Sequence, residues 1–357
     1  MIKDIKPTVL VIAGAGTKGI YGYLGPLYVL KKTNWLDQVH TFAGTSIGSF
    51  FAACLCLNYD IKDLVSFAWN LNYFKYTSKI SVSSFIQKGF ATDTMIVKEW
   101  LQILIEKKTG KKDLTLQELY EYSGKTFMCN SILKSEKPIH EIYTHKSHPN
   151  LYLSDVVQNS CNLPLLFKSE FVDGGVVNNF LIDQFDDQKE RILGLRFKKV
   201  FPIVSDLISS ENFEYKNNDP IQKHNDSTNN KQTNKNNKTN NDIYQSEIAT
   251  NQNLYENDEN LTFSEVLASM NHPGLSTMNI FKNLLWVFMI QNQELERLKY
   301  KNIKYECIQL EPLNLTTFSI FISNHDKISM FYKSLYTTML YIRKKILNYQ
   351  PKSTQQL

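Results

Sequence analysis

The clearest indication of chemistry is a serine between two glycines, in the segment Gly44-Thr-Ser-Ile-Gly48. An apolar strand predicted at Val39–Ala43 precedes it, and an apolar helix predicted at Ser46–Leu57 follows it. Glycines relieve crowding at such a strand-to-helix turn, which presents the serine hydroxyl at the helix N-terminus. The pattern predicts Ser46 as the nucleophile of an acyl-transfer enzyme, with a plain glycine-rich helix start as the alternative.

A second glycine-rich turn, Gly14-Ala-Gly-Thr-Lys-Gly19, follows a predicted apolar strand at Val9–Ala13. Its backbone N–H groups form a nest that favours an anion. The anion is either the oxyanion of an acyl-transfer intermediate or a dinucleotide pyrophosphate, because GxGxxG is also the dinucleotide fingerprint. The dinucleotide interpretation needs an acid at the end of the second strand, whereas Asp37 lies before that strand. A simple tight turn is the third possibility.

A nucleophilic serine needs a base, and the residues alone leave two kinds open. His272 and His325 stand in the chain order of an α/β-hydrolase triad, after the serine and an acid. Asp173 ends the apolar run Phe-Val-Asp and precedes Gly174 and Gly175, so a tight turn with little bulk would hold its carboxylate. The same dipeptide is also common in ordinary hairpin turns.

Taken in order, GAGTKG, GTSIG and DGG resemble the patatin-like phospholipase family. The resemblance continues in LTLQELYEYSGKTF and in NSCNLPLLF, which contains Ser160 and Pro164, and it covers most of the chain outside residues 211–260. Two positions depart from the family pattern. Ala15 replaces the middle glycine of a common GGG, and Phe180 stands where a proline often follows the asparagine after DGG.

The resemblance implies an α/β fold, with a mainly parallel sheet flanked by helices, that is related to but distinct from the α/β-hydrolase fold. It implies a lipid acyl hydrolase that cleaves fatty-acyl esters of glycerophospholipids through an acyl-enzyme. Ser46 would be the nucleophile and Asp173 the proton acceptor, in a dyad without histidine. N–H groups of Gly14, Ala15 and Gly16 would form the oxyanion hole. The residues expected to support the motifs are Lys18, Gly19, Gly44, Gly48, Gly174 and Gly175.

Two other functions remain open beside this one: an esterase with a histidine triad, and a non-catalytic protein that binds a nucleotide or phosphate through GAGTKG. Lys18 is a candidate to offset negative charge on a substrate, with a solvated loop lysine as the alternative. No acidic cluster suggests a metal site, and no cofactor is expected.

Strands that alternate with helices predict one α/β domain. Residues 211–260 contain 15 asparagines in 50 residues and too few apolar side chains to offset the entropy of ordering. We expect a patatin-like core at 1–210, a disordered insertion at 211–260, and the remainder of the same domain at 261–357. The further elements that we predict are strands at Thr126–Leu133, Ile139–Tyr143, Arg191–Phe197 and Ile303–Leu310, and helices at Met95–Lys108, Leu153–Asn159, Ser264–Met270, Ser276–Leu298 and Lys327–Leu347.

Charge and cysteine content exclude several classes. With 40 Lys and Arg against 35 Asp and Glu, the formal charge of +5 is too mild to indicate a nucleic-acid partner. The five cysteines are scattered without a CxxC pair, which favours a reducing compartment over a disulfide framework. The longest apolar run, Phe50–Leu57, is far short of the ~20 residues of a spanning helix. We therefore expect no signal peptide and a cytoplasmic protein.

The C-terminal helix gives a possible route to a membrane. Residues 327–357 contain six basic residues and no acid. The helix is interpreted either as packed on the core or as an interfacial helix attracted to anionic lipid, so peripheral membrane contact joins the lipid substrate as a predicted partner. Its predicted apolar stripe comprises Ile328, Phe331, Leu335, Met339, Ile342 and Ile346, followed by the cations Arg343, Lys344 and Lys345.

Overall fold

The computed structural model describes residues 5–71, 92, 95–163, 167–187, 189–198, 303–313, 315 and 322–348. Within them a mixed sheet has the strand order β4-β3-β2-β1-β6-β7, with β5 paired to β3 off this path. The pairs β1–β2, β1–β6, β2–β3 and β6–β7 are parallel, while β4 and β5 run antiparallel to β3. The predicted α/β fold with a mainly parallel sheet is therefore confirmed. The strands are β1 Val9–Ile12, β2 Thr41–Gly44, β3 Thr126–Leu133, β4 Ile139–Tyr143, β5 Phe171–Asp173, β6 Ile192–Phe197 and β7 Glu306–Leu310.

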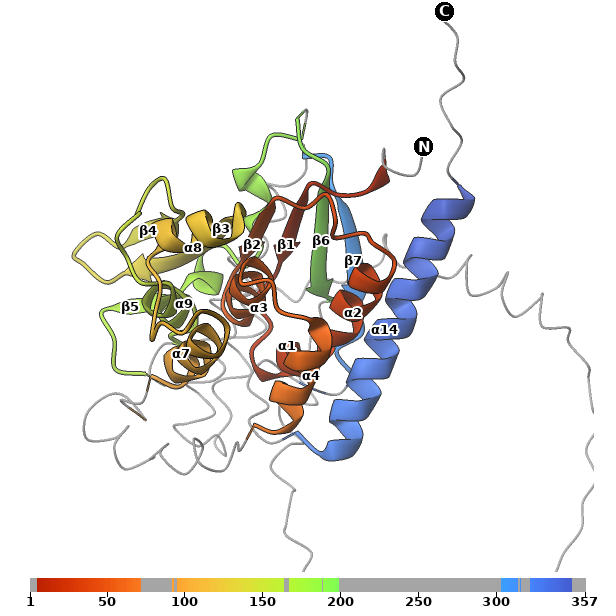
Figure 1. The fold of residues 1–357 in the computed structure, drawn as a ribbon, viewed down its shortest axis with the longest axis horizontal. Helices are drawn as coiled ribbons and strands as arrows, with labels where there is room; N and C mark the ends of the chain where they lie inside the picture. The colour runs from red at the N-terminus through yellow and green to blue at the C-terminus, as the bar shows by residue number, and fades with distance from the viewer. Residues whose placement is uncertain are drawn as a thin grey trace, which may run out of the picture. The chain divides into compact units, whose positions relative to one another are not determined.

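Helices cover the sheet as Figure 1 shows, with α3 against its middle strands, α9 against β3, and α7 packed on α9. Two short 3₁₀ turns, η2 and η3, follow β5. The helices of the described residues are α1 Thr17–Gly22, α2 Leu24–Lys32, α3 Ile47–Cys56, α4 Ile61–Trp69, α7 Ile96–Thr109, α8 Leu116–Ser123, α9 Leu153–Ser160 and α14 Asn324–Leu347, and the 3₁₀ turns are η2 Gly174–Val176 and η3 Leu181–Gln184. None of these helices is both long enough and apolar enough to cross a bilayer.

Both faces of β1 are buried, which explains its unbroken apolar sequence. Leu10 and Ile12 point into the larger core with the helices, whereas Val9 and Val11 join a smaller cluster around η3. A strand buried on both faces has no room for a polar side chain. The central strands therefore hold the loops at their carboxyl ends on a rigid support.

The local signals at helix ends predicted most boundaries within a few residues. The capping box of Thr115 and Glu118 begins α8, and Gly110 ends α7 in a left-handed conformation, φ 74°. Apolar residues from Ile20 to Leu30 recur at helical spacing, which predicts one helix with a kink at Pro26. The structure instead interrupts it at Tyr23, between α1 and α2. Pro26 then lies in the first turn of α2, where its missing N–H leaves no hydrogen bond unmade.

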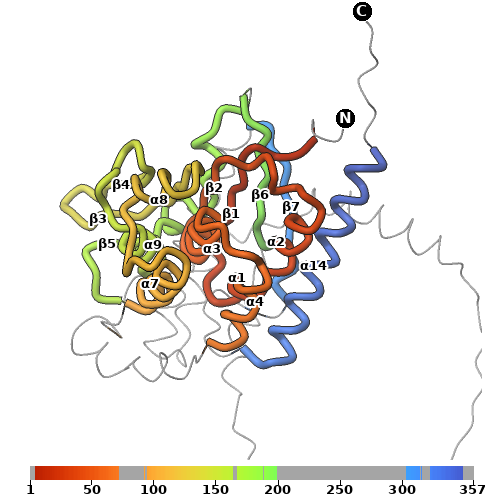
Figure 2. Tube along the Cα trace, viewed as in Figure 1, coloured from red at the N-terminus to blue at the C-terminus, as the bar shows by residue number. Residues whose placement is uncertain are grey.

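The strand predicted at Ile303–Leu310 is β7, which lies parallel to β6 despite their separation in the sequence. Figure 2 shows the two side by side, β6 in green and β7 in blue. The predicted helices at Ser264–Met270 and Ser276–Leu298, and the expected insertion at 211–260, lie outside the described residues. The division of the chain into core, insertion and remainder stays a prediction.

The packed face of α14 differs from the predicted stripe. Its buried residues are Met330, Ser334, Thr338 and Ile342, whereas Ile328, Met339 and Ile346 are exposed. The cause is a close helix contact. A Cβ on Gly25 of α2 would stand only 2.4 Å from the carbonyl oxygen of Phe331 and 2.7 Å from Ser334 Oγ. Small side chains on α14 permit this approach, so they face inward in place of larger apolar ones.

Candidate active site

The turn between β2 and α3 holds Ser46 in a strained backbone conformation, φ 53° and ψ −130°. A non-glycine residue adopts these angles only where its surroundings impose them, as at a nucleophile elbow. Close packing imposes them here. A Cβ on Gly48 would lie 2.2 Å from the Ile12 carbonyl oxygen, and one on Gly44 would lie 2.3 Å from the Gly48 carbonyl. Both glycines are therefore required by backbone contact.

The Gly14–Gly16 loop lies directly beside this turn, since a Cβ on Gly14 would be 3.3 Å from Ser46 Cβ. The Gly14 N–H donates to the Asn179 carbonyl, and Asn179 Nδ2 donates back to the Gly14 carbonyl, each at 3.1 Å. Gly14 thus anchors the loop and does not offer the N–H expected of it. No described residue accepts from the N–H of Ala15 or Gly16. These two are the donors the loop leaves for an oxyanion.

Asp173 ends β5 and is buried, with 3% of its surface exposed. Burial raises the pKa of its carboxyl from 3.8 to about 6, and hydrogen bonding from the Ser46 side chain and the Gly175 N–H partly opposes the rise. The Gly175 N–H lies 2.7 Å from Oδ1, and the Asp173 N–H donates to the Asn162 carbonyl at 2.8 Å. The structure therefore brings the predicted serine and acid together, with the acid tuned towards neutral pH.

The other predicted motif residues support this geometry from nearby. A Cβ on Gly174 would meet the Asn130 amide at 2.4 Å, and one on Gly19 would meet Ile47 Cγ2 at 2.6 Å. Lys18 places its amine 5.3 Å from the centre of the Phe197 ring, and burial lowers its pKa to about 8. Its charge is thus held over an aromatic ring and is not freely solvated.

Asn130, which the motifs did not identify, joins the two halves of the site. Its Oδ1 accepts from Thr45 Oγ1 at 2.9 Å, while its Nδ2 donates to the carbonyls of Asn178 at 2.9 Å and Gly174 at 3.3 Å. It therefore connects the residue before Ser46 with the turn after Asp173. A buried amide in the otherwise largely apolar strand β3 was the signal in the sequence.

The end of α9 holds the backbones of both candidate catalytic residues. Ser160 Oγ accepts the Ser46 N–H at 2.8 Å, and two residues later the Asn162 carbonyl accepts the Asp173 N–H at the same distance. Ser160 was noted in the sequence only as part of a motif, without a role. The intervening Cys161 is buried, which raises its pKa well above the ordinary value, so its thiol stays protonated beside Ser46.

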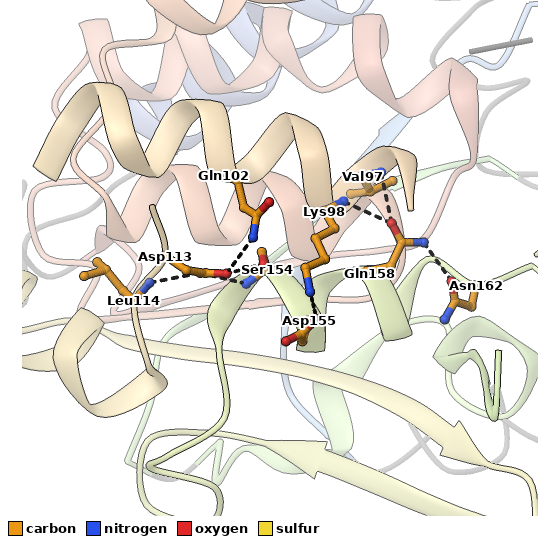
Figure 3. Close-up of polar contacts among 9 residues, drawn as sticks. All are labelled: Val97, Lys98, Gln102, Asp113, Leu114, Ser154, Asp155, Gln158 and Asn162. Atoms are coloured by element: carbon orange, nitrogen blue, oxygen red, sulfur yellow. Dashed lines mark hydrogen bonds and ion pairs between the residues drawn. The ribbon is translucent and has the colours of Figure 1, made fainter. Parts of the chain in front are cut away.

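A polar network fixes this segment to α7, as Figure 3 shows. Gln158 Nε2 donates to Asn162 Oδ1 at 2.7 Å, and Gln158 Oε1 accepts the N–H groups of Val97 and Lys98, both at 3.0 Å. The Lys98 amine also pairs with the Asp155 carboxylate. The first turn of α7, whose N–H groups lack partners within the helix, is thereby tied to the segment that positions Asp173.

The alternatives from the sequence find less support in the described residues. His325 lies on the exposed first turn of α14, 3.5 Å from Ser329 Oγ, and His272 lies outside the described residues. Asp37 precedes β2 and so lies at the amino-terminal ends of the parallel strands, whereas the Gly14–Gly16 loop lies at their carboxyl ends. Among the described residues, no three His, Cys, Asp or Glu side chains are grouped to hold a metal ion.

Residues 10–186 match the family model described as patatin-like phospholipase. This stretch contains the glycine loop after β1, the serine turn after β2 and Asp173 at the end of β5. The chain belongs to the patatin-like phospholipase family.

Among curated proteins, the chain is 28% identical over 242 residues to "Uncharacterized protein L620" of Acanthamoeba polyphaga mimivirus, a match covering 52% of this chain and 65% of that protein. It is 25% identical over 191 residues to "Probable lipid hydrolase 463L" of Invertebrate iridescent virus 6, covering 49% and 61%. The chain thus spans just under two thirds of these relatives. Among solved structures, VipD from Legionella pneumophila aligns with a TM-score of 0.46 and 14% identity, covering 95% of this chain and 67% of VipD.

Proposed function

We propose that this protein is a lipid acyl hydrolase that cleaves fatty-acyl ester bonds of glycerophospholipids through a Ser46–Asp173 dyad. The observation that carries the proposal is the buried Asp173 carboxyl beside the side chain of Ser46, which stands at a strained turn and partly opposes the rise in the pKa of that carboxyl. Membership of a family named for phospholipases, and a relative named a probable lipid hydrolase, support the substrate class.

In the proposed reaction Asp173 accepts the Ser46 proton as Oγ bonds to the ester carbonyl carbon. The resulting oxyanion faces the N–H groups of Ala15 and Gly16, and losing one such donor costs about 10²–10³ in turnover. When the intermediate collapses, the carbon–oxygen ester bond breaks and Asp173 returns the proton to the leaving alcohol. Water, deprotonated by Asp173, then attacks the acyl-enzyme, which releases the fatty acid and restores Ser46.

The raised pKa of Asp173 matters for this role. A carboxyl at its ordinary pKa of 3.8 would be a weak base, whereas one at about 6 is still ionised at neutral pH and binds a proton more readily. The neighbouring Lys18, above the Phe197 ring, is placed beside the loop where it would offset negative charge on a phospholipid.

Fatty-acid release from phospholipid vesicles and from a soluble short-chain ester tests the proposal. We expect Ser46→Ala and Asp173→Asn each to lower kcat by about 10³-fold or more, because each removes a group that bonds or moves a proton in the transition state. Asp37→Asn is the matched acid control and should keep full activity, because Asp37 precedes β2 and lies away from the Gly14–Gly16 loop. Undiminished hydrolysis by both dyad variants would overturn the proposal.

A further inference from the structure

The outward face of α14 is more apolar than part of its buried face. Tyr332 is 63% exposed, whereas Thr338 on the packed side is fully buried. With 3.6 residues per turn, the exposed apolar side chains fall within one arc of about 120°. This outer stripe consists of Ile328, Tyr332, Tyr336, Met339, Leu340, Ile346 and Leu347.

The packing of α14 explains why these side chains are not needed by the core. Ser334 Oγ and Thr338 Oγ1 donate to carbonyls of their own helix, those of Phe331 and Ser334, both at 2.9 Å. The two hydroxyls are satisfied where they are buried, and their small size permits the contact with Gly25 described above. The large apolar residues on the outer side therefore contribute little to the packing of α14 on the core. Contiguous apolar surface of this kind marks interaction sites.

The charges around the outer stripe indicate an anionic partner. On the helix, Arg343 falls within the arc, and Lys333 and Lys344 fall next to it; among the described residues these cations have no ion-pair partner. Lys345, which the sequence grouped with them, instead pairs with Glu306. The single acid of α14, Asp326, is bonded to the N-cap Ser323. A stripe that combines tyrosines, aliphatic side chains and unpaired cations matches the interface of a bilayer that contains anionic lipid.

The first turns of α14 contact α1, the helix that follows the glycine loop. The Trp69 ring contacts those of Phe331 and Tyr21, with centroids 5.7 and 5.3 Å apart, and the Lys327 amine lies 5.2 Å from the centre of the Tyr21 ring. Tyr21 belongs to α1, which directly follows the Gly14–Gly16 loop. The N-terminal end of α14 therefore lies near the carboxyl ends of the parallel strands, the same end of the sheet as Ser46.

We propose that the outer stripe of α14 docks the protein on the surface of an anionic lipid bilayer. The proposal rests on the proposed function for its purpose, which is to bring the Ser46 edge to a membrane substrate. The binding step itself needs no catalysis. Binding can therefore be measured with the full chain carrying Ser46→Ala, which should not hydrolyse the lipid of the vesicles.

The experiment is co-sedimentation with vesicles of phosphatidylcholine alone or of phosphatidylcholine with phosphatidylserine. We expect stronger binding to the second, and a loss of about tenfold in the partition coefficient when Tyr336→Ser and Ile346→Ser are combined. Tyr122→Ser with Ile103→Ser is the matched control, because those side chains are exposed to a similar extent, 45% and 53% against 54% and 46%, on α8 and α7. Arg343→Glu should cost about fivefold or more, and Lys107→Glu little.

The second measurement uses the same stripe variants with Ser46 left intact, so that their hydrolytic activity can be assayed. Hydrolysis of a soluble short-chain ester should be unchanged, which separates docking from chemistry and shows that the variants fold. Sedimentation that is absent for the parent chain, or equal in stripe and control variants, would refute the docking proposal and leave the proposed function standing. A change of oligomeric state in the stripe variants with unaltered sedimentation would assign the stripe to a second copy of the chain, and would refute it too.

Discussion

Ser46 and Asp173 meet at one point but are held there by different kinds of contact. The serine turn is fixed by backbone packing, because a side chain on Gly48 would have no space against Ile12 and one on Gly44 would have none against Gly48. The acid is fixed by hydrogen bonds, from its own N–H to Asn162 and to its carboxylate from Gly175. The first arrangement stands in the middle of a parallel sheet, and the second on a three-residue strand.

The difference teaches which changes each half tolerates. A turn held by shape is disrupted by one added methyl group, but contains no titrating group of its own. A carboxyl held by hydrogen bonds in a buried place depends on its amide partners and on pH. Asn130 connects the two halves, so its loss should affect both.

The largest expected effect is on the side held by shape. Gly48→Ala would place a Cβ 2.2 Å from the Ile12 carbonyl oxygen, so the free energy of unfolding should fall by about 3 kcal/mol or more. Urea denaturation measures the change. Gly110→Ala is the control, because a Cβ there meets open space and only its φ of +74° is unfavourable, a cost of about 1 kcal/mol. Equal losses in the two variants would show that close packing does not hold the turn.

The next effect isolates the buried acid. The pKa of Asp173 in the folded chain lies above its ordinary value of 3.8, so the folded state binds the proton more tightly and its stability falls as pH rises from about 4 to about 6. The rise to about 6 corresponds to at most about 3 kcal/mol. Asp173→Asn should therefore match the wild type at pH 4 and exceed its stability at pH 8, in thermal or urea unfolding. A stability difference that does not vary with pH would contradict burial as the cause.

The third prediction concerns Asn130, which connects the serine turn with the turn after Asp173. Asn130→Ala removes one hydrogen bond from each of Thr45 Oγ1 and the Gly174 carbonyl. Both groups keep another partner, the Asn178 carbonyl for Thr45 and the Val177 and Asn178 N–H groups for Gly174, so stability should fall by only about 1 kcal/mol. We also expect kcat on a soluble ester to fall about tenfold with little change in KM, because both catalytic groups lose a positioning contact. Asn70→Ala, which removes an exposed amide bonded to Ser66, should change neither. Lost stability with unaltered kcat would make Asn130 a purely structural residue.

The smallest effect is the pH dependence of turnover. Because the base must be ionised, kcat/KM for a soluble ester should rise about tenfold per pH unit below about 6 and level off above it. Initial rates across this range give the midpoint. A midpoint near 4 would mean that burial does not raise the pKa of Asp173. The contrast between a serine held by packing and a buried acid that depends on pH would then be wrong.

The sequence predicted those features that depend on neighbouring residues. The bounds of β3 and β4 agree with those of the strands predicted there, and the three glycine motifs lie at strand ends as expected. Contacts between distant segments were not predictable. Asn130 has its role only because β5 pairs with β3, and the Gly14 N–H is taken by Asn179, far along the chain. The prediction of the packed face of α14 was wrong, because the close contact with Gly25 on α2 decides which side chains of α14 face inward.

The pairing of β6 with β7 has a consequence for synthesis of the chain. The sheet edge at β6 is complete only once residues 198–305 have been made and β7 has followed them. At about 5–20 residues per second, this leaves the edge of β6 without its partner strand for about 5–20 seconds on the ribosome. An open strand edge pairs readily with other chains, so yield during expression should depend on chaperones or low temperature more than the stability of the finished sheet suggests.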